Sequence, residues 1–308
     1  MRIVFMGTPD FAVPCLKKLS EAGHEICGVF TQQDKPKGRG YVLTPPPVKE
    51  FAITHGLEVF QPKTLRSDES IRLLQRLAPE CIVVVAYGKI LPQEILEMPV
   101  NGCINVHASL LPRYRGAAPI QWSVINGETV TGVTTMYMDA GVDTGDMLLK
   151  AETQIGENET AGELHDRLSQ MGAELIVETL ERMEKGSLQR EKQDDSLSCY
   201  AGRLDKNLSQ IDWNKSAQQV HNLIRGLTPW PMAQTELQGK TLKIHQSRIT
   251  GMTRDGRAGQ VISTQPFYIR CGDGRVLEIL EVQLEGKKRM PARDFFRGHP
   301  VEEGALLG

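Results

Sequence analysis

The 308-residue chain lacks several features that would each define a class of protein. It has no run of about 18 consecutive apolar residues, so we expect no transmembrane helix. The apolar run that opens the chain is too short for a signal peptide and is better interpreted as a first strand. Its six cysteines form no C-x-x-C pair and lie mostly in apolar runs, which predicts reduced thiols in a cytoplasmic protein.

A glycine fingerprint for dinucleotides is also missing. The turn Gly7-Thr8-Pro9-Asp10 follows the first expected strand, where such a cofactor would bind, but the pattern G-x-G-x-x-G is absent. Pro9 and Asp10 would fit an incoming pyrophosphate poorly. A nucleotide-dependent dehydrogenase is therefore disfavoured, and we interpret the turn as the start of a helix.

Charge is nearly balanced overall but unevenly distributed. The whole chain has a net charge of −2, whereas residues 205–308 carry 15 Lys+Arg and 11 Asp+Glu, a net charge of +4. Residues 1–204 therefore carry 21 basic and 27 acidic residues, a net charge of −6. A mildly basic C-terminal part is weak support for a polyanionic partner and decides nothing alone.

Short β-rich runs alternate with helical stretches in the first part of the chain. The continuous apolar runs at residues 2–6, 25–30, 81–86 and 103–106 predict strands that are buried on both faces. Helical patterns between them imply a Rossmann-like α/β domain with a mostly parallel sheet. Residues 132–138 and 146–150 predict two further strands, and a capping box at Thr160 and Glu163 opens a long helix that ends at Gly186.

The C-terminal part has a different pattern. Residues 187–204 are polar and unpatterned, as in a linker. A short helix at 216–227 is followed by several short β-like runs with glycine-rich turns, which predict a small, OB-like β-barrel. We therefore expect a domain at 1–186, a linker at 187–204 and a second domain at 205–308, with Trp213 and Trp230 in the barrel core.

Asn105 and His107 are the first candidates for chemistry. At positions i and i+2 of a strand, their side chains point to the same face, and at the strand's carboxyl end that face is where open α/β sheets bind ligands. The amide can donate to an oxyanion while the imidazole moves a proton, which suits acyl transfer. By itself this pair is a weak signal, and a buried, hydrogen-bonded histidine is the commoner explanation of such a residue. Cys103 and His107 are only two potential ligands, so we expect no metal site.

Three aspartates form a second polar cluster in "MDAGVDTGD", between two expected strands. One of Asp139, Asp143 and Asp146 could reach His107, hold its tautomer and raise its pKa. An Asp/Gly-rich hairpin loop would explain them as well, and spacing does not decide. Their spacing does not match an EF-hand loop.

Residues 31–50 are a third feature. A βα connection normally has about 2–6 residues, and this one is much longer and holds Lys35, Lys37, Arg39 and Lys49, with Gly38 and Gly40 on either side of the arginine. A flexible, cationic segment of this kind suits a phosphate-bearing substrate.

With these residues in place, a family resemblance becomes clear. The stretches "INVHASLLPRYRGAAPIQW" and "MDAGVDTGDML" resemble the formyltransferases that use 10-formyltetrahydrofolate. Within that family, "GTPDFAVPCL", "GVFTQQDKPKGRG", "VVVAYGKILP", "IDW" and "GLTPWPMA" are similar to the branch that acts on methionyl-tRNA. The resemblance covers about residues 1–232, and the remainder matches only in general character.

The resemblance implies an activity and a set of site residues. The expected reaction transfers a formyl group from 10-formyltetrahydrofolate to the α-amino group of methionine on initiator tRNA, with Asn105, His107 and Asp143 as catalytic residues and without a metal. The residues implied to bind folate are Ala86, Tyr87, Gly88, Ile90, Leu91, Pro92, Ser109, Leu110, Leu111 and Pro112. Those expected to contact tRNA are Lys35, Lys37, Arg39, Lys206, Lys287, Lys288 and Arg289.

Other activities remain open at this point. The nearest is a folate-dependent formyltransferase for a nucleotide-linked amino sugar, which would have less need of a long basic insertion. A glycinamide ribonucleotide formyltransferase would lack the C-terminal third, and a hydrolase or dehydrogenase of formyl-folate would need different partner domains. A non-catalytic RNA-binding module would not need the Asn105, His107 and Asp143 set. We expect a monomer.

Overall fold

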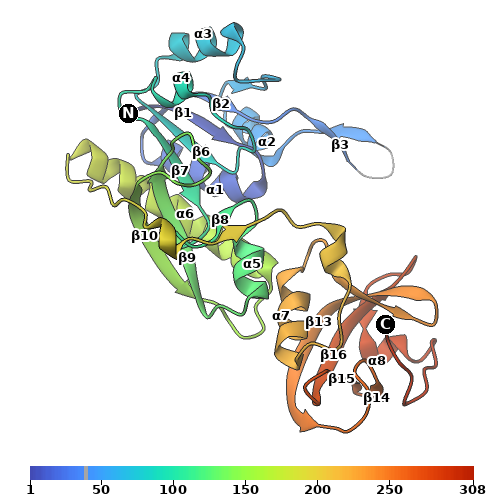
Figure 1. Cartoon of the computed structure of the whole chain (residues 1–308). Coiled ribbons are helices and arrows are strands. Elements are labelled where there is room, and N and C mark those ends of the chain that lie inside the picture. The colour runs from blue at the N-terminus through green and yellow to red at the C-terminus, as the bar shows by residue number, and fades with distance from the viewer. Residues whose placement is uncertain (38–40) are drawn as a thin grey trace. The chain divides into compact units, whose positions relative to one another are not determined.

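The computed structural model describes residues 1–37 and 41–308, which form two compact units (Figure 1). Unit 1 comprises Met1–Gly116, Gly132–Thr153 and His165–Tyr200. Unit 2 comprises Ala117–Thr131, Gln154–Leu164 and Ala201–Gly308. Each unit is built around a sheet of its own. Across the described part of the chain, no helix combines the length and apolar character needed to cross a bilayer.

Unit 1 is built on a seven-stranded sheet with the order β10-β9-β7-β6-β1-β2-β5. Its strands are β1 (Arg2–Gly7), β2 (Glu25–Phe30), β5 (Val59–Phe60), β6 (Cys81–Val85), β7 (Cys103–His107), β9 (Val130–Tyr137) and β10 (Met147–Gln154). The pairs from β5 to β7 are parallel, and β9 joins β7 antiparallel. All four apolar runs thus form strands, which confirms the predicted Rossmann-like, mostly parallel sheet.

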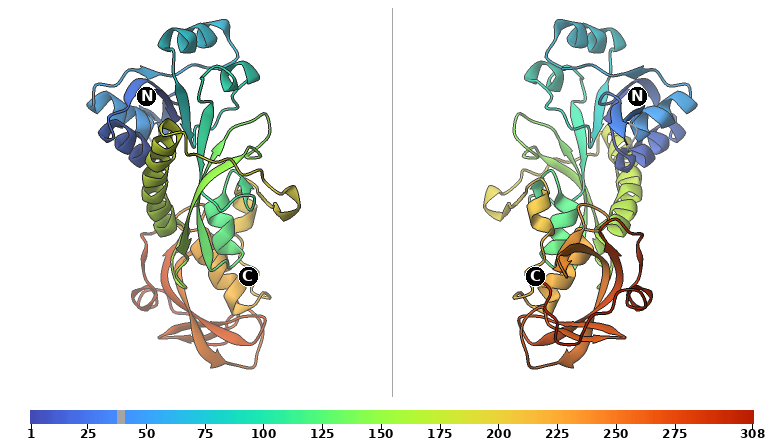
Figure 2. Two further views of the ribbon diagram at one scale, coloured as in Figure 1. Left: turned by 90° about the vertical axis from the view of Figure 1, so that its left-hand side faces the viewer. Right: turned by 90° about the vertical axis from the view of Figure 1, so that its right-hand side faces the viewer.

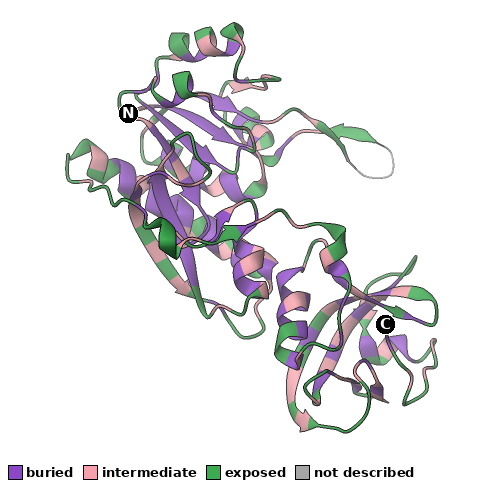
Figure 3. Cartoon of the chain, viewed as in Figure 1, coloured by how far each residue is buried: buried purple, intermediate pink, exposed green. Residues whose placement is uncertain are grey.

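Helices cover both faces of this sheet. They are α1 (Val13–Glu21, preceded by the short η1, Asp10–Ala12), α2 (Pro47–Thr54), α3 (Asp68–Leu77), α4 (Gln93–Leu96) and α6 (Ala161–Glu184). Figure 2 shows α6 along one face, where the Thr179 hydroxyl is 2.8 Å from that of Thr135 on β9. On the other face, Leu74 of α3 and Ile95 of α4 share a buried cluster with strand residues. The strands between the helices are therefore buried on both sides (Figure 3).

Capping residues fix the helix starts as the sequence predicts. The Glu163 backbone N–H donates to Thr160 Oγ1 at 3.2 Å, and the Thr160 N–H donates to the Glu163 carboxylate at 2.8 Å. This is the reciprocal capping box. Ser67 accepts from the Ser70 N–H at the start of α3 in the same manner.

The long connection after β2 contains an exposed hairpin. Its strands are β3 (Lys35–Lys37) and β4 (Val42–Thr44), which pair antiparallel, and the chain then enters α2. Val42 and Leu43 are exposed apolar side chains on it. Residues 35–37 and 42–44 of this segment thus pair as two antiparallel strands.

Unit 2 is built on a six-stranded sheet with the order β12-β13-β16-β15-β14, to which β17 adds on β16. Its strands are β12 (Ala233–Leu237), β13 (Lys240–Thr253), β14 (Val261–Thr264), β15 (Phe267–Arg270), β16 (Arg275–Leu284) and β17 (Met290–Pro291). Its helices are α5 (Pro119–Ile125), η3 (Lys206–Ser209), α7 (Ala217–Gly226) and α8 (Ala292–Phe295). Each neighbouring pair of strands in this sheet is antiparallel, which is consistent with the predicted small barrel.

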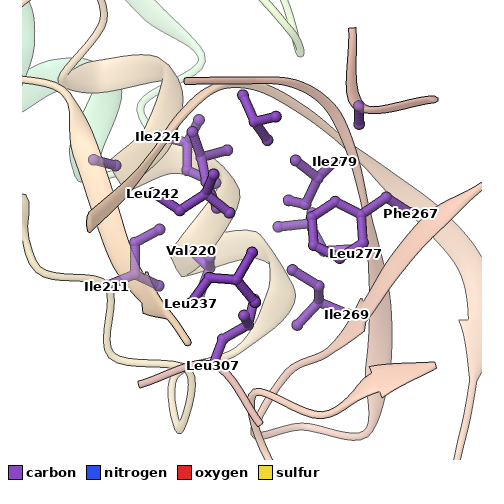
Figure 4. Packing of buried hydrophobic residues seen from close by; sticks show 14 of the residues in the cluster. Ile211, Val220, Ile224, Leu237, Leu242, Phe267, Ile269, Leu277, Ile279 and Leu307 are labelled. Carbon is purple, nitrogen blue, oxygen red and sulfur yellow. The ribbon is translucent and has the colours of Figure 1, made fainter. Parts of the chain in front are cut away.

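The core of unit 2 is formed where α7 packs on this sheet. Figure 4 shows Val220 and Ile224 of α7 among strand residues such as Leu242 and Leu277. Trp213 belongs to this core and donates from its indole N–H to Thr235 Oγ1 at 3.0 Å. Trp230 does not, since its side chain is 58% exposed. The prediction that it is buried was wrong, because Pro229 and Pro231 hold it in a turn outside any helix or strand.

All six cysteines are free, and four of them are buried. Burial raises the pKa of the Cys15 thiol to about 12, so that thiol is inert near neutral pH. Cys199 is the exposed one.

Candidate active site

The carboxyl ends of neighbouring strands bring the candidate residues of unit 1 to one edge of the sheet. Val84 of β6 pairs with Asn105 of β7, and Gly7 of β1 pairs with Val85 of β6. The turn after β6, the turn after β1 and His107 at the end of β7 therefore share this edge. Open α/β sheets bind their ligands there.

Asn105, His107 and Asp143 meet at this edge. Asp143 comes from the connection between β9 and β10 and has a φ of +54°, a left-handed conformation that aspartate tolerates better than most residues. Its Oδ1 accepts from Asn105 Nδ2 at 3.4 Å, and its Oδ2 lies 3.7 Å from His107 Nδ1. The carboxylate thus faces both the amide and the imidazole. Asp139 instead accepts from Gly141 and Thr144 within its own loop.

Hydrogen bonding defines which nitrogen of His107 is available. Nε2 lies 2.9 Å from the backbone carbonyl of Tyr114. Because a carbonyl oxygen can only accept, Nε2 carries a proton, and Nδ1 is the nitrogen that gains or loses one. The side chain is 6% exposed. His107 is therefore both a buried, hydrogen-bonded histidine and a neighbour of a carboxylate, so the two interpretations of the sequence are compatible.

Two residues that the sequence did not single out hold the Asp143 loop. Gln193 Nε2 donates to the backbone carbonyls of Asp143 and Gly145, at 2.8 Å each. Its Oε1 accepts from Arg115 Nε and Nη2 at 3.0 and 2.8 Å, and Arg115 also reaches Asp195 Oδ1 at 2.7 Å, at the start of η2 (Asp195–Leu197). Gln193 lies in a stretch without periodicity, so only its buried amide in the structure reveals it.

Backbone contacts complete the support of Asp143. The Gly116 N–H, in the short strand β8 (Arg115–Gly116), donates to its Oδ2 at 2.8 Å. The preceding Arg115 N–H donates to the Cys199 carbonyl at 2.9 Å, directly before β11 (Tyr200–Ala201). The position of the Asp143 carboxylate is thus fixed by Gly116, which precedes β9 in the chain, and by Gln193, which follows β10.

The turn Ser109–Pro112 is anchored to β9. Thr134 Oγ1 donates to the Ser109 carbonyl at 2.7 Å and accepts from the Leu111 N–H at 3.2 Å. The Ser109 hydroxyl is buried and donates to the Arg113 carbonyl at 2.7 Å. It is therefore a structural hydroxyl and not an activated nucleophile. Leu111 is buried against Met136 and Met147.

The turn Ala86–Pro92 presents backbone rather than polar side chains. Ala86 and Gly88 have φ values of +47° and +77°, and the Tyr87 carbonyl accepts from Thr8 Oγ1 and Gln32 Nε2, both at 3.0 Å. The Tyr87 side chain points into the core, where its hydroxyl has no hydrogen-bond partner among the described residues, and burial raises its pKa to about 12. Leu91 is buried, whereas Ile90 is 75% exposed.

The basic residues expected to contact RNA belong to both units. Lys35 and Lys37 lie on β3 of unit 1, and Lys35 Nζ donates to Gln32 Oε1 at 2.9 Å. Arg39 lies outside the described residues. In unit 2, Lys206 opens η3, and Lys287 and Lys288 are exposed in the turn between β16 and β17. Arg289 is paired with Glu281. Within residues 1–37 and 41–308 no group of three or more metal-ligating side chains comes together.

The fold and this Asn–His–Asp group define a transferase of acyl type, and the chain belongs to the formyl transferase family. The family model "Formyl transferase" matches residues 1–180, and "Formyl transferase, C-terminal domain" matches residues 203–300.

Full-length relatives refine this placement. The chain is 54% identical over 310 residues to the methionyl-tRNA formyltransferase of Geobacter sulfurreducens, with 100% of this chain and 97% of the relative covered. It is 51% identical over 309 residues to that of Alkaliphilus oremlandii, with 100% of both chains covered.

Solved structures share the fold at lower identity. A Helicobacter canadensis N-formyltransferase in complex with folinic acid and dTDP-3-aminofucose has a TM-score of 0.66 and 20% identity, covering 90% of this chain and 98% of that one. HypX from Aquifex aeolicus, in complex with tetrahydrofolic acid, has a TM-score of 0.67 and 17% identity, covering 100% of this chain and 50% of that one. At these identities the likeness concerns the fold alone.

Proposed function

We propose that the protein transfers the formyl group of 10-formyltetrahydrofolate to the α-amino group of methionine esterified to initiator tRNA. The observation that carries the proposal is the convergence of Asn105, His107 and Asp143 at one strand end in a chain that aligns over its whole length with methionyl-tRNA formyltransferases. We further propose a cytoplasmic monomer with a catalytic domain at 1–186, a linker at 187–204 and an RNA-binding domain at 205–308.

Asn105 stabilises the charge that develops on the formyl oxygen. The attacking amine must be neutral, and free α-amino groups titrate at about 7.7–8.0, so neutral pH supplies enough nucleophile. As the amine adds, the formyl oxygen becomes an oxyanion. One N–H of Asn105 is directed at Asp143, which orients the amide so that the other N–H can donate to that oxygen. Loss of one such donor costs about 10²–10³ in rate.

His107 moves the proton that the amine loses. Nδ1 takes this proton, and the Asp143 carboxylate at 3.7 Å stabilises the resulting imidazolium. The proton is then delivered to the folate nitrogen as its bond to the formyl carbon breaks. The Tyr114 carbonyl keeps the ring in place by holding Nε2. Such proton transfer contributes about 10²–10⁴ in rate.

Two turns at the sheet edge are proposed to hold the folate. The residues are Ala86, Tyr87, Gly88, Ile90, Leu91, Pro92, Ser109, Leu110, Leu111 and Pro112. The turn after β6 offers backbone groups and the exposed Ile90 side chain, whereas Tyr87 contributes only through its backbone. Planar, amide-rich heterocycles are commonly bound by such backbone groups beside apolar side chains.

Basic residues of both units are proposed to hold the tRNA. Lys35, Lys37 and Arg39 of the hairpin segment would contact the acceptor end. Lys206, Lys287, Lys288 and Arg289 would contact phosphates of the tRNA body. These contacts supply affinity and register rather than sequence recognition.

The test is a formylation assay with purified protein, 10-formyltetrahydrofolate and methionine-charged initiator tRNA, in which formyl-methionine is measured. Wild type is expected to make formyl-methionine, and His107→Asn to lose about 10²–10⁴ of the rate. His55→Asn is the control, because His55 is exposed in the turn directly after α2. An amino-sugar nucleotide is included as a competing acceptor. Formylation of the sugar alone would overturn the choice of tRNA and leave the catalytic assignment intact.

A further inference from the structure

Four polar residues of unit 1 lie between the base of the basic hairpin, which is proposed to contact RNA, and the turn after β6, which is proposed to hold folate. They are Gln32, Asp34, Lys49 and Gln61, which we call the Asp34 cluster. Lys49 Nζ donates to both carboxylate oxygens of Asp34, at 2.9 and 2.8 Å, and to Gln61 Oε1 at 2.7 Å. Gln61 Nε2 donates to Asp34 Oδ1 at 2.9 Å and to the Gln32 carbonyl at 2.7 Å. Asp34, Lys49 and Gln61 thus bond to one another through their side chains, and Gln32 is connected to them through its backbone carbonyl. Each of the four side chains is only partly exposed.

One side of the cluster closes the base of the basic hairpin. Asp34 directly precedes β3, and Lys49 follows β4 in the first turns of α2. Their ion pair therefore joins the chain entering the hairpin to the chain leaving it. The hydrogen bonds from Lys49 and Gln61 hold the pKa of the Asp34 carboxyl below its usual value, so it stays charged near neutral pH.

The other side of the cluster holds the turn after β6. Gln32 Nε2 donates to the carbonyls of Tyr87 and Gly88 at 3.0 and 3.3 Å, and the Gln32 N–H donates to Thr8 Oγ1, itself a donor to Tyr87. Gly88 has a φ of +77°, and a Cβ there would collide with Gln32 Nε2. The turn and the Gln32 amide are therefore in direct contact, without room for a side chain between them.

We propose that the Asp34 cluster is a set of positioning residues that fixes the base of the hairpin relative to the turn after β6, so that the RNA acceptor and the folate donor are presented in register. None of the four side chains needs to touch a reacting atom. The inference depends on the proposed function, because it assigns the hairpin to RNA and the turn to folate. A displacement of about 1 Å far from the chemistry can cost about 10²-fold in rate, so such a link has a measurable effect.

The decisive variant is Asp34→Asn, because electrostatics and positioning predict opposite results. Removal of a negative charge beside the basic hairpin would, through charge alone, strengthen RNA binding. If the cluster positions the hairpin, kcat/KM for methionyl-tRNA instead falls by about 10- to 100-fold. The dissociation constant for 5-formyltetrahydrofolate, measured without RNA, is expected to rise several-fold as well, although Asp34 lies outside the residues proposed to bind folate.

Glu58→Gln is the matched control, since it removes the same charge from an exposed side chain of the same unit. Glu58→Gln is expected to leave kcat/KM for methionyl-tRNA and the dissociation constant for 5-formyltetrahydrofolate unchanged. Gln61→Met keeps the net charge and removes three hydrogen bonds of the network, so it decides the matter if Asp34→Asn lowers the melting temperature strongly. Gln61→Met, like Asp34→Asn, is expected to raise the dissociation constant for 5-formyltetrahydrofolate.

These assays distinguish a failure of the proposed function from a failure of the positioning role. A wild-type protein that makes no formyl-methionine would overturn the proposed function. An active wild type, with Asp34→Asn and Gln61→Met matching Glu58→Gln in kcat/KM and in folate binding, would overturn the positioning role alone.

Discussion

Asp143 shows how much one side chain depends on its surroundings. Its carboxylate faces His107 and Asn105 because the Gly116 N–H donates to Oδ2 and Gln193 donates to the backbone carbonyls of Asp143 and Gly145. An amide at this position could still accept from Gly116, but it would carry no charge to stabilise a protonated His107. In the proposed mechanism the charge of Asp143, rather than its hydrogen bond, is therefore the feature that proton transfer requires.

This leads to a prediction for Asp143→Asn. We expect kcat for formyl transfer to fall by about 10²–10⁴-fold, with little change in the folate dissociation constant, because the loop geometry survives. Steady-state kinetics together with folate titration would measure both. A variant with wild-type kcat would show that His107 works without the carboxylate.

The buried hydroxyl of Tyr87 is expected to lower the stability of the fold. It is buried without a hydrogen-bond partner among the described residues, and an unsatisfied buried polar group costs about 1–3 kcal/mol. Tyr87→Phe removes the hydroxyl and keeps the ring, so we expect the melting temperature to stay the same or rise. Thermal unfolding of the two proteins would test this, and a clear fall would reveal a bound water as the missing partner.

Individual residues of the site were predictable to different degrees. Asn105 and His107 could be identified because strand alternation places i and i+2 on one face. Spacing alone could not choose among Asp139, Asp143 and Asp146. The role of Gln193 could not be predicted from the sequence, because it depends on a contact with a loop about 50 residues earlier in the chain.

At the scale of elements, α7 carries a buried histidine that links three segments of unit 2. His221 Nε2 donates to the Glu157 carbonyl at 3.0 Å, and its Nδ1 lies 2.9 Å from Ser247 Oγ on β13. Since Nε2 carries the proton, Nδ1 accepts from the serine hydroxyl. A second proton on Nδ1 would displace that hydrogen bond. Burial accordingly lowers the pKa of His221 below its usual value of 6.5.

The stability of the protein should therefore depend on pH through His221. With the folded pKa lowered, the unfolded chain binds more protons below pH 6.5, so stability is lost as pH falls through that value and is regained above it. We expect the melting temperature to fall between about pH 7.5 and 5.5. His221→Gln should show a flatter profile, and identical profiles for both proteins would assign the acid sensitivity to other groups.

The elements themselves were largely predictable, and the reason is periodicity. Continuous apolar runs indicated β1, β2, β6 and β7, and the capping box at Thr160 and Glu163 indicated α6. The hairpin of β3 and β4 was not foreseen, because its glycines and lysines indicate a loop. Trp230 was placed wrongly since composition does not reveal which aromatic residue a turn leaves exposed.

At the scale of the whole molecule, the C-terminal part carries the net positive charge. Residues 205–308 have a net charge of +4, and within them Arg248 and Arg289 are paired with Glu278 and Glu281. The exposed Lys287 and Lys288 are adjacent to the second pair. Both side chains are exposed, and neither has an acidic partner in the described part of the chain, so their charges face solvent.

We therefore expect Lys287→Ala combined with Lys288→Ala to weaken tRNA binding in a salt-dependent way. Each phosphate contact contributes about 0.7–0.9 to the slope of log K against log salt, so loss of two contacts should reduce the slope by about 1.4–1.8. Titration with initiator tRNA at several salt concentrations measures it. Lys17→Ala is the control, because it removes a charge that Glu21 already pairs. If the double variant kept the wild-type slope, these lysines would not touch the RNA backbone, and the affinity would have to come from other basic residues.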